Sequence, residues 1–318
     1  MEENKQNEDI KTETAEEEKK DGLRVGIYLV MLFTITYLYE YFYVVKPIKY
    51  GEGNNIANIS LWVAVAMFFP ALCVFFTRLI TREGLKGSYL NFDLKKGKYK
   101  YYLLAWFAPA VVTLLGMIIY FVCFMGDFSY DMKFMIDTYT KQGISGITPD
   151  AARKSAISQA ITAVVIGPVI NCITCFGEEW GWRGYLLPKL KDRLKTLPLL
   201  VVTGIIWGLW HLPLTLMGHN YGMDYEGYPY LGVLAMVIFC FSIGTLFSYV
   251  TLKTGSCVPA IIGHGAVNSI ASLGIMFTRD GGRLLFGPSP AGLISGIPLF
   301  VLAVILIRFM TNNDEKEK

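Results

Sequence analysis

Eight apolar runs constrain this chain more than any other feature, because each is long enough to cross a bilayer as a helix. They are roughly Leu23–Val45, Ile59–Ile80, Tyr101–Phe124, Ile157–Leu187, Leu199–Met217, Tyr230–Leu252, Cys257–Phe277 and Ala291–Met310. Hydrophobic residues make up 53% of the chain and charged residues only 17%, a balance that excludes an ordinary soluble enzyme. We therefore expect an all-α polytopic integral membrane protein with about eight transmembrane helices.

The chain divides into one membrane domain with a polar tail at each end. Residues 1–22 have almost no apolar side chains and are expected to form a disordered cytoplasmic tail. Residues 23–310 are expected to form the transmembrane domain, and residues 311–318 a short cytoplasmic tail. Twenty of the 29 Lys and Arg residues lie on the side of the two tails, and eight lie on the other side. By the positive-inside rule, both termini of this multi-pass cell-membrane protein face the cytoplasm.

Charged and amide side chains stand inside three of the apolar runs. A charged side chain at the bilayer centre costs at least about 2.5 kcal/mol, so such residues usually mark function. Glu178 lies in the fourth run, beside the first of three pairs of residues spaced four apart. These pairs are Glu179 and Arg183, Trp207 and His211, and His264 and Asn268. Because this spacing puts both residues of a pair on one helix face, we expect three polar faces to meet in an intramembrane cavity.

The residues in these runs supply the parts of a hydrolytic site. A carboxylate beside a neutral imidazole can deprotonate a water molecule. A second histidine and an asparagine amide can donate hydrogen bonds to a developing oxyanion. Together they favour attack of water on a peptide carbonyl. Alternatively, Glu178, His211 and His264 ligate zinc, although the His-Glu-x-x-His pattern of many zinc proteases is absent. The residues leave open whether the cofactor is zinc or none.

The three motifs, in this order on hydrophobic helices, resemble those of one family. They read Glu178-Glu179-Trp180-Gly181-Trp182-Arg183, Trp207-Gly208-Leu209-Trp210-His211 and His264-Gly265-Ala266-Val267-Asn268. They are similar to the motifs of the CAAX protease and bacteriocin-processing (CPBP or Abi) intramembrane endopeptidases, which include the type 2 CAAX prenyl endopeptidases. The resemblance covers roughly residues 157–277, the motif core. It departs at Trp207, where the family usually has Phe, an aromatic change that we expect to leave catalysis intact.

The resemblance implies a role for each motif residue. By this resemblance, the catalytic residues of the chain would be Glu178, His211, His264 and Asn268. The first two would activate the catalytic water, and the last two would stabilise the oxyanion. Glu179 and Arg183 would hold the helices and the catalytic side chains in place. The family has been associated both with metal dependence and with a metal-free glutamate mechanism, so the resemblance also leaves zinc open.

Plainer interpretations of the same residues exist. Glu179 and Arg183 can be a structural ion pair, and Asn268 can simply join two helices. A single buried histidine is more often packed in a core than catalytic. His219 lies in a polar loop, and we assign it no function.

Small residues and two prolines accompany the polar faces. Gly177 and Gly181 form one Gly-x-x-x-Gly pair, and Gly204 and Gly208 form another. This spacing allows close approach of helices. Pro213 and Pro259 are expected to kink their helices near the site and to free backbone groups.

Three functions follow from these expectations. The first is an endopeptidase that cuts a protein or peptide substrate, with or without a lipid group, near the cytoplasmic side of the bilayer. The second is a non-catalytic bacteriocin-immunity or membrane scaffold protein of the same family. The third is a transporter, but the chain lacks the repeated pair of broken helices that many transporters have. We expect the lipid bilayer and a protein or peptide substrate as partners, and no nucleic acid.

Overall fold

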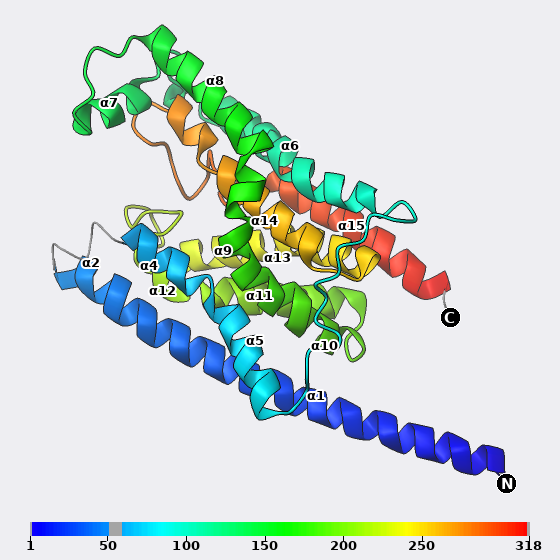
Figure 1. Ribbon diagram of the computed structural model, residues 1–318. Coiled ribbons are helices and arrows are strands. Elements are labelled where there is room, and N and C mark those ends of the chain that lie inside the picture. The colour runs from blue at the N-terminus through cyan, green and yellow to red at the C-terminus, as the bar shows by residue number, and fades with distance from the viewer. Residues whose placement is uncertain (1, 51–58, 317–318) are drawn as a thin grey trace.

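The computed structural model describes residues 2–50 and 59–316 of this chain. Within these two ranges the regular structure is helical, and the only β-type pairing is a single bridge between Phe128 and Thr278. The expected all-α class is confirmed. In Figure 1 the helices form one bundle, and both ends of the chain lie on the same side of it.

Short π-helical and 3₁₀ turns extend several of the α-helices. In chain order the elements are α1 (Glu2–Glu40), η1 (Tyr41–Val45), α2 (Lys46–Tyr50), α4 (Ile59–Ala66), α5 (Phe69–Ile80), α6 (Tyr99–Cys123), η2 (Met125–Asp127), α7 (Lys133–Lys141), α8 (Pro149–Val165), α9 (Gly167–Gly181), η3 (Trp182–Leu186), α10 (Leu187–Lys191), α11 (Thr196–Trp210), α12 (Leu212–Thr215), α13 (Tyr230–Thr254), α14 (Val258–Ile270), η4 (Leu273–Phe277) and α15 (Ile297–Lys316).

All eight apolar runs become helices, but eight membrane spans are not confirmed. In the described part of the chain, five helical stretches are long and apolar enough to cross a bilayer: Glu17–Lys49, Ile59–Ile80, Tyr99–Cys123, Tyr230–Thr254 and Val258–Phe277. Helices α8 and α9 make a sixth if they count as one span, although they meet at an angle of 54°. The apolar parts of α11 and α15, Thr196–Trp210 and Ile297–Asn312, are shorter than a span requires.

The break between α8 and α9 explains why the fourth run is longer than a bilayer needs. Pro168 lies in the first turn of α9 and has no backbone N–H. It therefore cannot donate the hydrogen bond that would continue α8 into α9. The chain therefore bends at Ile166, and only the second half of the run carries the polar motif.

The N-terminal tail differs from the expectation of disorder, because α1 is continuous from Glu2 into the first apolar run. Glu, Lys and Gln are strong helix formers, so a tail rich in them can extend an existing helix without a new nucleation step. Salt bridges on the helix surface support it: Arg24 lies 2.7 Å from Glu17 and 2.8 Å from Asp21.

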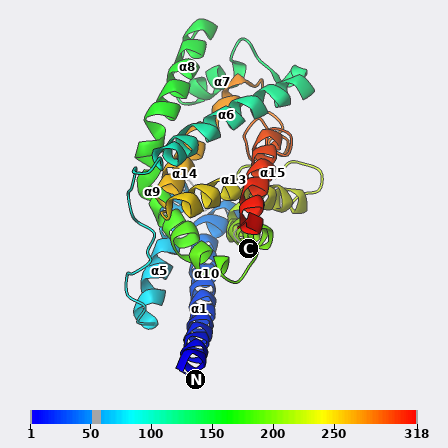
Figure 2. The same ribbon diagram turned by 90° about the vertical axis from the view of Figure 1, so that its right-hand side faces the viewer.

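One end of the bundle, which we call the terminal face, carries both chain ends and the loops 81–98, 192–195 and 255–257. Contacts join these segments: the N–H of Cys257 donates to the carbonyl of Tyr89 at 2.7 Å, and Lys189 on α10 pairs with Asp21 on α1 at 2.6 Å. Figure 2 looks at the molecule from the side of this face.

The opposite end, which we call the far face, carries the loops 124–132, 216–229 and 278–296. The bridge between Phe128 and Thr278 joins the first and third of these loops. The hydroxyl of Tyr221 donates to the carbonyl of Ala291 at 3.1 Å and joins the second and third. The two faces are therefore each held together by contacts between distant parts of the sequence.

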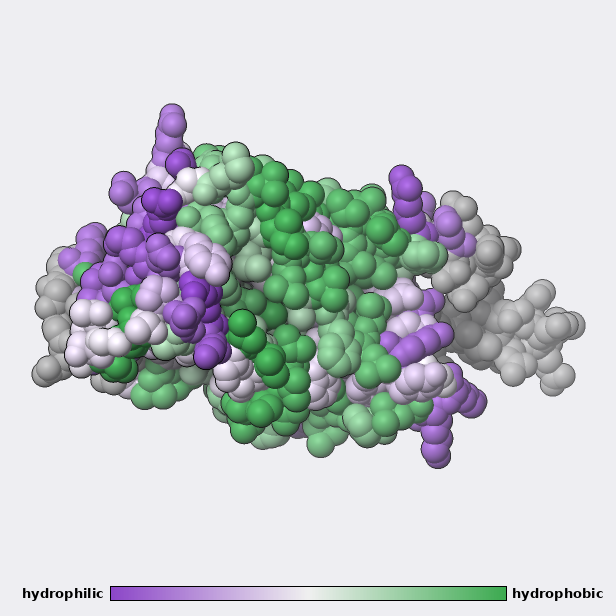
Figure 3. Space-filling view, turned by 90° about the horizontal axis from the view of Figure 1, so that it is seen from above, coloured by the Kyte–Doolittle hydropathy of each residue, from purple (hydrophilic) through white to green (hydrophobic). Residues whose placement is uncertain are grey.

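A broad hydrophobic belt separates the two faces. In Figure 3 hydrophilic residues gather at both ends of the molecule, and hydrophobic residues cover the surface between them. Many large apolar side chains of the helices are well exposed, among them Ile118, Val122, Ile170, Ile173 and Phe309. Such a continuous exposed apolar surface is stable only against lipid. The chain is a multi-pass membrane protein.

Both Gly-x-x-x-Gly pairs mark close helix packing, as predicted. A Cβ atom added to Gly177 would lie 2.4 Å from the carbonyl oxygen of Met67, so α9 lies directly against the start of α5. A Cβ atom on Gly208 would lie 2.7 Å from the Cα of Val237, which places α11 equally close to α13. Helix α14 packs between α9 and α6. These contacts bring the three motif-bearing helices around one centre.

Candidate active site

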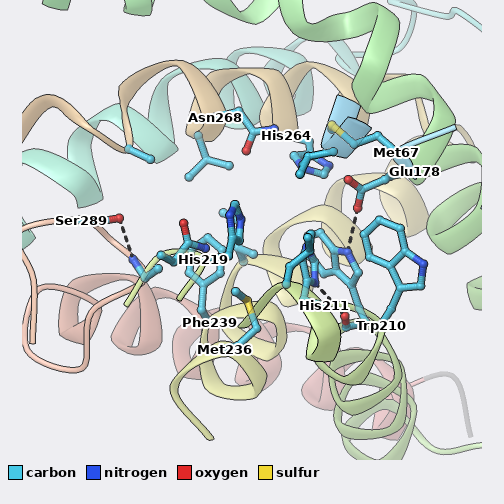
Figure 4. A pocket seen from close by; sticks show the side chains of 18 of the residues that line it. Met67, Glu178, Trp210, His211, His219, Met236, Phe239, His264, Asn268 and Ser289 are labelled. Carbon is cyan, nitrogen blue, oxygen red and sulfur yellow. Dashed lines mark hydrogen bonds between the residues drawn. The ribbon is translucent and has the colours of Figure 1, made fainter. Parts of the chain in front are cut away.

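A single cavity of about 260 Å³ is lined by all four predicted catalytic residues. They are Glu178 on α9, His211 at the end of α11, and His264 and Asn268 on α14. Trp207, predicted as a supporting residue, also lines it. Figure 4 shows these side chains around the cavity, together with Met67 and Met236 from its apolar wall. The three faces that the spacing of four predicted therefore do meet.

Two indole groups hold one oxygen of Glu178. Its Oε2 accepts a hydrogen bond from Nε1 of Trp207 at 2.9 Å and a longer one from Nε1 of Trp182 at 3.4 Å. The residue is only 2% exposed. Among the described residues no side chain or backbone group donates to Oε1, so this oxygen remains available to a molecule in the cavity.

His211 presents one ring nitrogen as an acceptor. Its Nδ1 lies 2.9 Å from the backbone carbonyl of Trp207. Because a carbonyl oxygen can only accept, Nδ1 carries the hydrogen, and in the neutral ring Nε2 is left unprotonated. Trp207 therefore touches both partners of the predicted water-activating pair, Glu178 through its indole and His211 through its carbonyl.

His211 owes its position to the end of α11. Pro213 cannot continue the helix because it lacks an N–H for the carbonyl of Leu209, and the chain turns at His211. The freed carbonyl accepts a hydrogen bond of 2.5 Å from the hydroxyl of Tyr37 on α1. The prediction that Pro213 breaks its helix and frees a backbone group is confirmed. The same prediction is wrong for Pro259, which lies in the first turn of α14 and does not interrupt that helix.

Glu179 points away from the cavity and ties α9 to α14. Its Oε1 accepts from the guanidinium of Arg183 at 3.0 Å and from Nδ1 of His264 at 2.9 Å. Glu179 is fully buried and Arg183 is 4% exposed. The guanidinium of Arg183 lies over the ring of Trp207, 4.3 Å from its centre, and 5.3 Å from the ring centre of Phe247.

His264 is enclosed, whereas Asn268 one turn later is not. The ring of His264 packs against those of Trp207 and Phe247, at 5.4 Å and 5.8 Å between centres. With Nδ1 bound to Glu179, only Nε2 of His264 can reach the cavity. Asn268 is exposed, and its only described partner is the sulfur of Cys175 at 3.7 Å. Its amide can therefore still turn toward a ligand.

Three polar residues with no function predicted from the sequence line the cavity near the far face: His219, Asn220 and Ser289. His219 and Asn220 are exposed, as expected of a polar loop. The loop nevertheless folds over the end of the cavity, so all three histidines of the chain line it. The rarity of histidine was the only signal in the sequence, since no spacing links His219 to the motifs.

The zinc alternative required Glu178, His211 and His264 to converge on one point. Among the residues that the structure describes, no group of three or more His, Cys, Asp and Glu side chains is arranged to hold a metal ion. As they are arranged, these residues do not fit a metal site, and we derive no step through one.

Comparison with known proteins agrees with the motifs. Residues 159–270 match the family described as type II CAAX prenyl endopeptidase Rce1-like. CAAX prenyl protease 2 of Methanococcus maripaludis is 30% identical over 104 residues, which are 32% of this chain and 38% of that protein. Lysostaphin resistance protein A of Staphylococcus haemolyticus is 23% identical over 249 residues, which are 77% of this chain and 57% of that protein.

The matched region contains every motif residue of the cavity, from Glu178 on α9 to Asn268 on α14. The chain covers less than two thirds of the length of either relative. The family match and the three ordered motifs therefore show that the membrane core of this chain, residues 159–270, is similar to the type II CAAX prenyl endopeptidase family.

Proposed function

We propose that this chain is an intramembrane endopeptidase that hydrolyses a peptide bond in a membrane-associated protein or peptide. One observation carries the proposal. Glu178 and His211, from different helices, line one cavity, and each keeps an acceptor atom that no described protein group engages. The family match supports the same class of activity.

In the proposed reaction, a water molecule lies between Oε1 of Glu178 and Nε2 of His211. Glu178 takes one proton from the water while the water oxygen forms a bond to the substrate carbonyl carbon. The carbonyl π electrons move onto its oxygen. When the tetrahedral intermediate collapses, the carbon–nitrogen bond breaks, and the proton held by Glu178 passes to the leaving amine. No covalent enzyme intermediate is needed.

His264 and Asn268 are the proposed donors to the oxyanion. His264 donates its Nδ1–H as a hydrogen bond to Glu179. To donate from Nε2 as well, the ring must be an imidazolium, and Glu179 is its counter-charge. Arg183 is the second cation bound to Glu179. The two carboxylates and two cations of the site then sum to zero charge, as a group buried in a membrane requires. Glu179 and Arg183 act as positioning residues.

A second candidate function is a non-catalytic role in resistance or as a membrane scaffold. It is favoured by one observation: the relative that matches over the larger share of this chain is named for lysostaphin resistance rather than for proteolysis. In that case the polar faces would serve only packing or partner binding, and protection would persist in Glu178→Gln.

The test compares membranes of cells that carry the wild-type chain with membranes that carry Glu178→Gln, which keeps the shape of the side chain but removes the base. New peptide termini are mapped by mass spectrometry, and the peptides that appear only with the wild type are remade as quenched fluorescent substrates. We expect the purified Glu178→Gln protein to cleave them about 10²–10⁴-fold more slowly. Equal cleavage by both proteins would refute the proposal.

A parallel sample with a chelator addresses the metal question directly. Cleavage that survives the chelator but is lost in Glu178→Gln supports the metal-free step described above. Cleavage that is lost in the chelator and restored by zinc would refute that step. His211→Ala serves as a second variant, because the same base pair should fail when either member is removed.

A further inference from the structure

The cavity has a closed inner end and an accessible outer end. At the inner end Glu178 and His264 are 2% and 5% exposed. At the other end His219 and Asn220 are exposed, and Asn268 between the two ends is exposed as well. In Figure 4 Ser289 lies at the opposite end of the lining from Glu178, and His219 lies between them. The accessible route to the proposed catalytic groups therefore passes His219 and Asn220.

The outer end belongs to the far face. His219 and Asn220 stand in the loop 216–229, and Ser289 stands in the loop 278–296. Both loops belong to that face, and Tyr221 and Ala291 join them next to the cavity. Along α14 the lining residues run the same way, from His264 to Ala271, away from the terminal face where this helix begins.

We infer that a substrate segment enters the cavity from the membrane face opposite to both termini, between His219, Asn220 and Ser289. The inference rests on the proposed endopeptidase function and specifies its substrate. Since the lysine and arginine bias puts the termini in the cytoplasm, the mouth opens on the extracytoplasmic side. This revises the expectation that cleavage takes place near the cytoplasmic side.

The lining also indicates the chemistry of the segment. Leu214, Met236, Phe239 and Val267 form an apolar wall between the mouth and Glu178. Among the described residues the lining contains no lysine or arginine, and the imidazolium proposed for His264 donates to the oxyanion, so no further cation is present to bind a terminal carboxylate. The amide of Asn220 and the imidazole of His219 can instead bond to an uncharged peptide backbone. The substrate that fits is an internal, apolar peptide segment exposed at the outer surface of the membrane.

Side-specific labelling of cysteines tests the direction of access without any need for cleavage. Ala271→Cys places a thiol on the cavity wall, and Cys123→Ser removes an exposed native thiol from the background. Asp131→Cys marks the far face and Asp192→Cys marks the terminal face, because both positions are exposed. A small membrane-impermeant methanethiosulfonate is added to intact cells and, separately, to inverted vesicles.

We expect Ala271→Cys and Asp131→Cys to be modified in intact cells, and Asp192→Cys only in inverted vesicles. Modification of Ala271→Cys only in inverted vesicles, or in neither preparation, would overturn the inference. Because labelling reports access alone, the endopeptidase proposal can fail while this result stands, or the reverse.

Kinetics then test the mouth residues. We expect His219→Ala and Asn220→Ala to raise KM about three- to tenfold with kcat nearly unchanged, the effect of one lost hydrogen bond to substrate. An equal KM in wild type and both variants would refute their role. A loss of kcat would instead place them in the chemical step.

Discussion

The indole nitrogen of Trp207 lies 2.9 Å from Oε2 of Glu178 and donates a hydrogen bond to it. From the sequence, Trp207 was expected to be only an aromatic wall, interchangeable with the Phe that is usual in the family. In the structure the indole also donates a hydrogen bond to Glu178, which a phenyl ring cannot do because it has no N–H. In this chain the orientation of the proposed base therefore depends on a residue that the motif alone does not specify.

Trp207→Phe should lower kcat by about tenfold or more, because Glu178 loses its shorter hydrogen bond while the wall remains largely filled. A hydrogen bond to a charged group contributes about 1.5–3 kcal/mol, so a comparable loss of stability is expected. Steady-state kinetics and thermal unfolding in detergent measure the two effects. Trp182→Phe is the matched control: its bond is longer, at 3.4 Å, and the effect should be smaller. A larger effect at Trp182 would contradict this ranking.

Most of the candidate site could be predicted from the spacing of four residues within each pair. It placed Glu179 with Arg183 on one face, and it brought Trp207, His211, His264 and Asn268 to one cavity, because a regular helix fixes which side chains share a face. The pairing of Glu179 with His264 could not be read in this way. It depends on the rotation of α14 against α9, which the packing of whole helices decides.

Other features depended on tertiary contacts in the same way. The fold of the loop 216–229 over the cavity rests on the contact of Tyr221 with Ala291, so His219 looked like an ordinary loop residue. The number of membrane spans could not be predicted from the sequence either. Apolar runs predict helices, but the length of α11 was set by Pro213 rather than by hydrophobicity.

Arg183→Gln should strongly destabilise the folded protein. It removes one partner of a buried ion pair and leaves Glu179 with only His264, a change that typically costs about 3–5 kcal/mol. The amount of monodisperse protein after size-exclusion chromatography, together with its unfolding temperature, measures the effect. Lys154→Ala removes an exposed cation and should change stability by no more than about 0.5 kcal/mol. Equal stability of both variants would show that the buried pair does not hold the helices.

Glu40→Met should raise the stability of the protein. Glu40 on α1 is fully buried, and neither carboxylate oxygen has a hydrogen-bond partner among the described residues. An unsatisfied buried polar group costs about 1–3 kcal/mol, which an apolar side chain of similar size would recover. Thermal unfolding measures the gain. Thr36→Val one turn earlier is the control, because it removes the bonded partner of Trp210 and should destabilise. A less stable Glu40→Met would mean that the carboxyl group has a partner in the membrane-bound protein.

Gly177→Ala should disrupt the site through packing alone. The new methyl group would lie 2.4 Å from the carbonyl oxygen of Met67, closer than any real Cβ contact, and that oxygen belongs to the backbone. Helix α9 must then move away from α5, and it carries the neighbouring Glu178 with it. We expect cleavage to fall about 10²-fold, because displacement of a catalytic group by 1 Å has an effect of that order.

Gly26→Ala on α1 is the matched control, since nothing lies within 4 Å of its new methyl group. There alanine should leave cleavage unchanged and stabilise the helix by up to about 1 kcal/mol. Equal cleavage by both alanine variants would show that the contact between α9 and α5 does not position Glu178.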